Sequence, residues 1–213
     1  MSFVTSVVPP NLPVAQEDYT RVYQEQLNNI LRLYFNQLNG NVNFVTGLSG
    51  GRFLQFPYAA IQRTTDQTFT ANTATQITFD QNDFLNGCSN PGTDGIEVTY
   101  AGIYNYQFSV QLKNTDTQIH SAWIWLRINN VDVPGTGSKF DVISSHGGTP
   151  GFVIAACNFY VELQANDTVE MWAAVDNTAV TFDATGASVS PFVMPAIPSV
   201  VATLTFVSTL PPT

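Results

Sequence analysis

The chain has 213 residues, of which 11% are charged, and a formal net charge of −9 with only seven lysines and arginines. Those basic residues are scattered, so the clustered Lys and Arg that bind a phosphate backbone are missing and we exclude nucleic acid as a partner. The same shortage argues against docking on anionic lipid, and no run approaches the roughly 18 apolar residues of a membrane span, so we expect no membrane insertion.

The first residues are expected to lie outside any domain. Residues 1–14 contain Pro9, Pro10 and Pro13 without any periodicity, which predicts an extended N-terminal arm. The segment has neither the basic start nor the apolar run of a signal peptide, so we expect no export by the secretory route. The arm is either a disordered terminus or a peg that threads into a neighbouring protein during assembly.

Residues 15–39 carry a helical pattern. Glu17 and Asp18 fall in the expected first turn and Gly40 lies where a helix stop is expected. An apolar stripe follows spacings of 4, 3, 4 and 4, widened by Leu31 and Phe35: Tyr23, Leu27, Ile30, Tyr34 and Leu38. The stripe either packs on the domain of its own chain or forms a short parallel coiled coil with other copies, and we favour self-association.

A Gly-rich linker is predicted at residues 40–51, followed by an all-β domain over residues 52–213. The expected strands cover residues 53–56, 75–80, 95–100, 103–113, 121–129, 139–143, 152–163, 168–175, 179–183 and 200–207. Residues 191–198 contain three prolines and are expected to form an extended crossover. Short strands at regular intervals, with no helices between them, predict a mostly β fold, an antiparallel sandwich or jelly roll, and exclude a parallel βαβ sheet.

Two strands of this domain are the most informative. Residues 104–112 alternate strictly, with Tyr104, Tyr106 and Phe108 on one face, which predicts a strand with one buried aromatic face. Residues 121–128 are apolar on both faces, because Trp123 and Trp125 lie between the aliphatic positions. A strand that is apolar on both faces needs a cover on both, so we expect Trp123 and Trp125 to contact other copies of the chain.

No set of residues predicts catalysis. His120 and His146 are the only histidines and are expected to be exposed or in loops, and no metal-ligand spacing is present. Glu162 and Glu170 flank a predicted turn and could pair across a hairpin, an arrangement more typical of a solvated sheet face. We therefore predict a protein that is not an enzyme and has no cofactor, while the oxygen-rich loop at residues 87–95 leaves a Ca²⁺ site open.

The two cysteines, Cys88 and Cys157, have two interpretations. Cys157 alternates with apolar residues, which favours a buried thiol. A disulfide between the two cysteines stays open, because sequence alone cannot establish a pairing.

Several motifs together resemble known proteins. Residues 101–104 (AGIY) lead into the aromatic strand, and residues 166–170 (NDTVE) open a later one, with Asn166 where the C1q and tumour-necrosis-factor superfamily has a glycine. The order resembles the jelly roll of that superfamily. More narrowly, the chain resembles bacteriophage virion proteins in four segments: LRLYFNQL, AGIYNYQFSVQL, IWLRINN and PAIPSV. The resemblance implies a homotrimer that the N-terminal arm and helix join to other virion proteins of the capsid or tail.

The function expected from this resemblance is that of a trimeric fibre or decoration protein on the phage particle. An alternative is a host-surface glycan receptor-binding module, whose loops would present Asn90, Asp94 and His146. A lower alternative is a secreted C1q-like protein. Localisation is expected to be the virion, assembled in the host cytoplasm and exposed on the particle surface.

Overall fold

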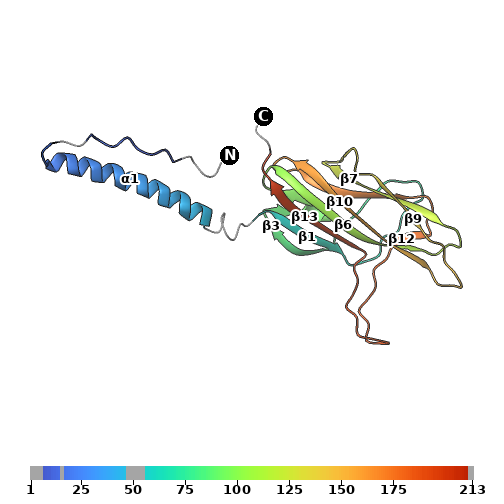
Figure 1. Ribbon diagram of the computed structural model, residues 1–213. Helices are drawn as coiled ribbons and strands as arrows, with labels where there is room; N and C mark the ends of the chain where they lie inside the picture. The colour runs from blue at the N-terminus through green and yellow to red at the C-terminus, as the bar shows by residue number, and fades with distance from the viewer. Residues whose placement is uncertain (1–6, 15–16, 47–55, 211–213) are drawn as a thin grey trace. The chain divides into compact units, whose positions relative to one another are not determined.

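The structure is a computed structural model that describes residues 7–14, 17–46 and 56–210 of the chain (Figure 1). Residue contacts divide the chain into two units, Met1–Gln55 and Phe56–Thr213. The division falls close to the predicted boundary between residues 51 and 52, which itself lies outside the described residues.

The first unit contains helix α1, Arg21–Thr46. The backbone N–H of Tyr23 donates to Oγ1 of Thr20 at 3.3 Å, so Thr20 caps the first turn. The predicted limits were wrong at both ends, because Glu17 and Asp18 precede the helix and Gly40 lies inside it. A single glycine costs a helix only about 1 kcal/mol, and no proline follows to end it. No helix in the described residues is long and apolar enough to span a membrane.

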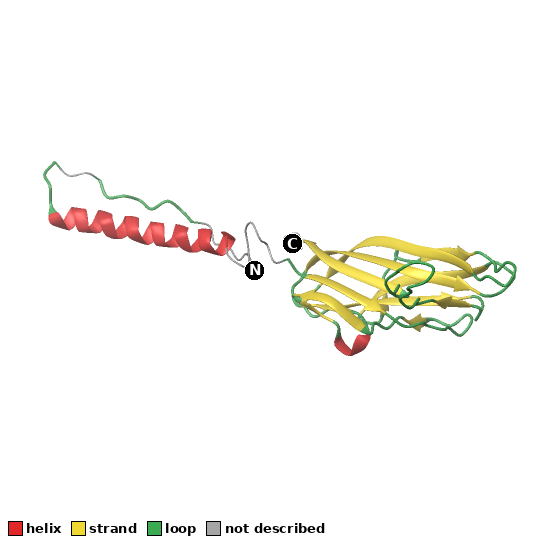
Figure 2. Ribbon diagram, turned by 90° about the horizontal axis from the view of Figure 1, so that it is seen from below, coloured by secondary structure: helices red, strands yellow, loops and turns green. Residues whose placement is uncertain are grey.

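The described part of the N-terminal arm, residues 7–14, runs antiparallel to α1 and beside it (Figures 1 and 2). The phenol of Tyr23 donates to the carbonyl of Pro13 at 3.4 Å. Val7, Pro10 and Pro13 are partly buried, at the three-residue period of an extended polyproline helix. We attribute the partial burial of the predicted stripe to this segment, a partner that the sequence analysis did not consider.

The second unit contains two antiparallel sheets. Sheet A has the strand order β10-β6-β13-β1-β3, with β12 also paired to β6. Its strands are β1 (Tyr58–Arg63), β3 (Gln81–Asn86), β6 (Gly102–Asn114), β10 (Gly151–Leu163), β12 (Val180–Phe182) and β13 (Val200–Ser208).

Sheet B has the order β4-β5-β11-β7-β8, with β2 paired to β11 and β9 paired to β7. Its strands are β2 (Thr75–Gln76), β4 (Cys88–Ser89), β5 (Ile96–Val98), β7 (His120–Ile128), β8 (Val131–Asp132), β9 (Ser138–Val142) and β11 (Thr168–Val175). One 3₁₀ turn, η2 (Pro91–Thr93), follows β4.

The chain passes repeatedly from one sheet to the other. It crosses from β1 to β2, from β2 to β3 and from β3 to β4, and again from β5 to β6, from β6 to β7, from β9 to β10, from β10 to β11 and from β11 to β12. The last strand, β13, then enters sheet A between β6 and β1. Two antiparallel sheets connected in this way form a jelly-roll sandwich, as the sequence predicted.

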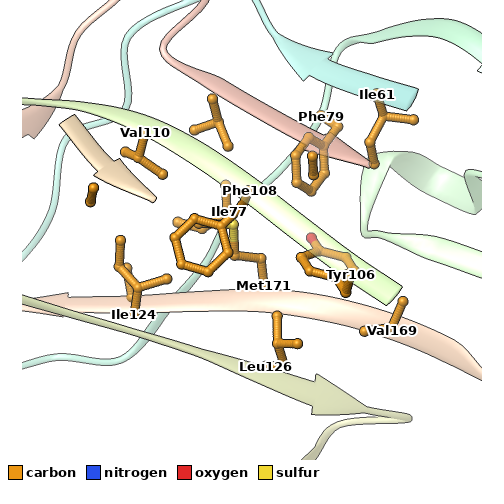
Figure 3. Close-up of a cluster of buried hydrophobic side chains, with 14 of the residues drawn as sticks. Ile61, Ile77, Phe79, Tyr106, Phe108, Val110, Ile124, Leu126, Val169 and Met171 are labelled. Atoms are coloured by element: carbon orange, nitrogen blue, oxygen red, sulfur yellow. The ribbon is translucent and has the colours of Figure 1, made fainter. Parts of the chain in front are cut away.

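The core lies between the sheets. Along β6, every second residue is buried from Gly102 to Asn114, which places the aromatic row inside. Figure 3 shows Tyr106, Phe108 and Val110 of this strand facing Leu126 and Met171 of sheet B. The predicted burial of the alternating strand is confirmed.

Candidate functional site

The outward surface of sheet A is unusually poor in charge. We name it the neutral face and define it by the outward side chains of β6, β10 and β13. Charged residues occur only at its two ends, as Lys113 opposite Phe152 and as Glu162 opposite Ile103. The residues between them on β6 and β10 are Asn105, Gln107, Ser109, Gln111, Ile154, Ala156, Asn158 and Tyr160.

The apolar part of the neutral face lies on β10, the edge strand of sheet A. Phe152, Ile154 and Tyr160 point outward and are 50%, 64% and 68% exposed. Within the described residues, no strand pairs with the free edge of β10. Edge strands are commonly protected from pairing with another chain by charged residues or prolines. β10 is long, has no proline and carries no charge before Glu162, so it lacks this protection.

The three tryptophans of the chain share the outward surface of sheet B, and we name them the tryptophan cluster. Trp172 on β11 lies directly opposite Trp125 on β7, and Trp123 precedes Trp125 by two residues on the same strand. The guanidinium carbon of Arg127 is 3.8 Å from the ring centroid of Trp172 and 6.0 Å from that of Trp125. Nζ of Lys139 is 5.9 Å from the Trp123 ring centroid. These are cation–π distances, so two cations cover part of the indole surface.

Carboxylates fix the orientation of two of these indoles. Nε1 of Trp125 donates to Asp132 at 2.7 Å, and Nε of Arg127 donates to the same oxygen at 2.6 Å. The hydrogen bond from Arg127, followed by that from Trp125, lowers the pKa of Asp132 below its usual 3.8. Nε1 of Trp172 donates to Glu170 at 2.9 Å. The indole N–H groups of Trp125 and Trp172 are therefore already occupied, and the orientations of these two rings are fixed.

The predicted contact role of Trp123 and Trp125 stays a prediction. Both lie on the outer face of the sandwich, as the two-faced pattern of their strand indicated. Trp123 keeps 38% of its surface exposed. In the helix, Leu38 is also 38% exposed, whereas Tyr23, Leu27, Ile30 and Tyr34 are partly buried, and their predicted contacts with other copies likewise stay predictions.

His120 differs from the sequence-based expectation. It is the first residue of β7, and its side chain is only 14% exposed rather than in an exposed loop. Nε2 lies 2.8 Å from Asp116 and Nδ1 lies 3.3 Å from Asp176. The hydroxyl of the adjacent Ser121 donates instead to Asp141. Both ring nitrogens face carboxylates, so the histidine is not arranged to take a proton from a serine nucleophile.

The loops predicted to face a glycan are not brought together. Asn90 follows β4 at the edge of sheet B, near the start of β11. Its side-chain amide donates a hydrogen bond to Oδ1 of Asn82. Asp94 is exposed, and its carbonyl accepts from Gln76 on the same edge. His146 is in an exposed turn beyond β9, next to the loop that leads into β7. The three residues therefore do not form one site.

Neither the glutamate pair nor the disulfide that the sequence left open is present in the structure. Glu162 is on β10 of sheet A and Glu170 on β11 of sheet B, so the two do not pair across a hairpin. Cys88 and Cys157 are free thiols, and burial raises the pKa of Cys88 to about 12. No group of three or more His, Cys, Asp or Glu side chains able to hold a metal occurs in the part of the chain that the structure describes.

Comparisons with known proteins add little to this geometry. No protein-family model matches the sequence, and no curated protein matches it. Among solved structures, the globular domain of zebrafish complement 1qA is similar, with a TM-score of 0.43 and 11% identity, covering 73% of this chain and 99% of that one. We base the jelly-roll assignment on the strand order and pairing described above.

The neutral face is the feature that sequence reasoning missed. The signal was present, because residues 152–155 (FVIA) are apolar at every position and must therefore place apolar groups on both faces of β10. The same reasoning that singled out Trp123 and Trp125 applies to Phe152 and Ile154. The pairing of β10 at the sheet edge, which makes this surface accessible, is a property of the assembled fold.

Proposed function

We propose that this chain is a structural protein of a bacteriophage particle, a homotrimer whose jelly rolls associate through the neutral face. The neutral face is the observation that carries the proposal. A second surface that covers the exposed side chains of Phe152, Ile154 and Tyr160 would lower the free energy by roughly 25 cal/mol per Å² of apolar area buried. The assignment to a phage particle is supported by the sequence motifs alone.

Charge favours another copy of the chain as the cover. Each copy has a formal net charge of −9, so two copies repel, and the local repulsion is smallest where the contact surface itself carries no charge. The neutral face meets that condition between Lys113 and Glu162, and Lys113 is itself paired with Asp183 at 2.7 Å. A closed ring of copies would cover this surface on every subunit.

The test of self-association uses the full-length protein at micromolar concentration. Light scattering should give the mass of a trimer, and the Ile154→Lys/Tyr160→Lys variant should give a folded monomer, because charge is placed in the contact. The matched control is Ile119→Lys/Val131→Lys, which alters two equally exposed residues outside the face and should stay trimeric. A monomeric unmodified protein, or equal disruption by both variants, would refute the proposal.

Attachment to the particle is assigned to the N-terminal arm and α1. Phe35, Leu38 and Val42 of α1 remain exposed at helical spacing, which supports a contact beyond this chain. A protein that lacks residues 1–46 should keep the circular dichroism of the β unit but fail to join particles assembled in its presence. Normal incorporation of the shortened protein would remove the attachment role.

A second candidate function, recognition of a host-surface glycan, is favoured by the tryptophan cluster. Indole faces stack on sugar rings, and partly exposed Trp123 offers one beside Lys139 and Asp141. Three weak sites on one trimer would gain from avidity. Glycan binding by the unmodified protein that is lost in Trp123→Ala would support this function, and no binding to any glycan would leave the structural role alone.

A further inference from the structure

A hairpin projects from the sandwich between β12 and β13, at residues 185–197 (Figure 1). Reciprocal backbone hydrogen bonds of 2.8–3.0 Å join Thr185 to Ile197 and Ser188 to Met194. The Pro-rich segment 191–198 therefore leaves the sheets as predicted, but it forms one side of a hairpin rather than a simple crossover. In the view from below, this loop points towards the reader, away from the strands (Figure 2).

The tip of this hairpin is apolar and exposed. Val189 is 85% exposed, Phe192 64% and Val193 84%. No charged residue follows Asp183 in the whole sequence, so the hairpin has no charge to keep it in water. A projecting, uncharged segment with three exposed large apolar side chains is typical of a contact surface rather than of a solvated loop.

An apolar groove lies at the base of the same hairpin. Its volume is about 370 Å³, and Phe152, Ile154, Thr185 and Ile197 are among the residues that line it. We name it the Ile154 groove. It opens at the end of the neutral face where Asp183, the one carboxylate in its lining, is paired with Lys113. Groove and tip thus match in being apolar and free of uncompensated charge.

The tip cannot fill the groove of its own chain. Val189 near the tip is the fourth residue after Thr185 at the base, which places the tip roughly 13 Å away at about 3.3 Å per residue. The paired backbone bonds keep the hairpin extended over that length. Only a tip from another molecule can therefore fill the groove, and the tip can be buried only against another molecule.

We propose that the 185–197 hairpin of one copy inserts Phe192 and Val193 into the Ile154 groove of the next copy. The inference rests on the proposed trimer, because the groove adjoins the neutral face through which the copies associate. Tip and groove are different patches of one molecule, so the contact is heterologous and is satisfied on every copy only when the ring closes. The hairpin would make the trimer an interlocked ring.

Cross-linking of the full-length protein tests the contact directly. Phe152→Cys and Val193→Cys are combined in one chain, and mild oxidation should produce covalent trimers on a non-reducing gel, since each tip reaches the groove of the next copy. Each single variant serves as a control and should give no species larger than a dimer. A disulfide confined to one chain, visible as a monomer that migrates faster, would overturn the inference.

A second variant measures the contact without added cysteines. Phe192→Ser/Val193→Ser should raise the trimer dissociation constant at least tenfold, since two apolar side chains lose their cover. Val131→Ser, equally exposed but on β8, should leave the constant unchanged. An unchanged constant for the tip variant, together with the absence of covalent trimers, would overturn the hairpin inference while the proposed trimer stands.

Two further outcomes separate the proposals. A monomeric unmodified protein would remove both the trimer and the hairpin contact. Tip variants that trimerise normally but no longer join particles would assign the hairpin to another virion protein and overturn the inference.

Discussion

Glu170, a residue that is only 4% exposed, connects two neighbouring parts of sheet B through its carboxylate. One oxygen accepts the backbone N–H of Asn130 at 3.1 Å, and the other accepts Nε1 of Trp172 at 2.9 Å. The residue thereby fixes the turn between β7 and β8 and the orientation of one member of the tryptophan cluster. A glutamate in this position is structural, whereas the sequence pattern favoured a solvated sheet face for Glu162 and Glu170.

Replacing this carboxylate should be costly. In Glu170→Ala, the N–H groups of Asn130 and Trp172 lose their acceptor, and we expect the free energy of unfolding to fall by about 1–3 kcal/mol. Urea unfolding followed by circular dichroism measures the change. Glu97→Ala is the control, because Glu97 accepts one long bond of 3.3 Å from exposed Ser89, and it should change stability by less than about 0.5 kcal/mol. Equal losses in the two variants would contradict this role of Glu170.

At the scale of elements, the start of β10 depends on a close approach of two backbone segments. A Cβ added at Gly151 would lie 1.9 Å from the carbonyl oxygen of Ile143, the residue that follows β9. No side chain fits at that distance unless the backbone moves. Gly151 therefore sets where the chain enters the edge strand that carries Phe152 and Ile154.

Gly151→Ala should accordingly lower the free energy of unfolding by about 1–3 kcal/mol, as overpacking does in a well-packed interior. Thermal unfolding followed by circular dichroism measures the loss. Gly137→Ala is the matched control, because Gly137 has no neighbour within 4 Å of an added Cβ and no positive φ, and its melting temperature should hardly change. A Gly151→Ala protein as stable as the control would show that the two segments separate easily.

Strand prediction succeeded where apolar and polar residues alternate strongly along the sequence. It failed where a segment is a strand only because it pairs with a neighbouring strand. The predicted segments 103–113, 152–163 and 168–175 match β6, β10 and β11 to within one residue, because their burial alternates with the pleat. β1 (Tyr58–Arg63) and β3 (Gln81–Asn86) were missed, and most of the strand predicted at 53–56 lies outside the described residues. β3 contains Asn82 and Asp83, which are typical of a turn, and only its place at the sheet edge makes it a strand.

At the scale of the whole molecule, carboxylates with lowered pKa values link stability to pH. A hydrogen bond from His120 holds the pKa of Asp116 below its usual 3.8, and one from Lys139 does the same for Asp141. Burial alone would raise the pKa of Asp80, but hydrogen bonds from Thr64 outweigh it and lower the value. These interactions are therefore made by the charged carboxylates.

The pH dependence follows from the direction of these shifts. A carboxyl whose folded pKa lies below its unfolded pKa stabilises the fold above the unfolded value and loses that effect as the pH falls through the folded one. We expect the melting temperature of the β unit to change little between pH 7 and 5 and to fall below about pH 4. The variant Asp116→Asn/Asp141→Asn should show a smaller fall, and an identical pH profile would contradict the assignment.

The candidate surfaces were harder to predict than the fold, because they depend on which strands become neighbours. Trp123 and Trp125 could be recognised from one strand, but Trp172 joins them only through the pairing of β11 with β7. The Ile154 groove likewise combines β10 with residues near 185 and 197. Local periodicity identifies what each strand exposes, and only the assembled sheets show what lies beside it.

The position of β13 has a consequence for synthesis on the ribosome. Residues 200–208 form the inner strand that holds β6 and β1 together, so sheet A cannot close until this stretch has left the exit tunnel. Until then, β6 and β1 expose the backbone groups that β13 will pair with, and only sheet B can be complete. If copies associate through the neutral face, as proposed, that association would follow translation of this last strand, because β13 forms part of the face.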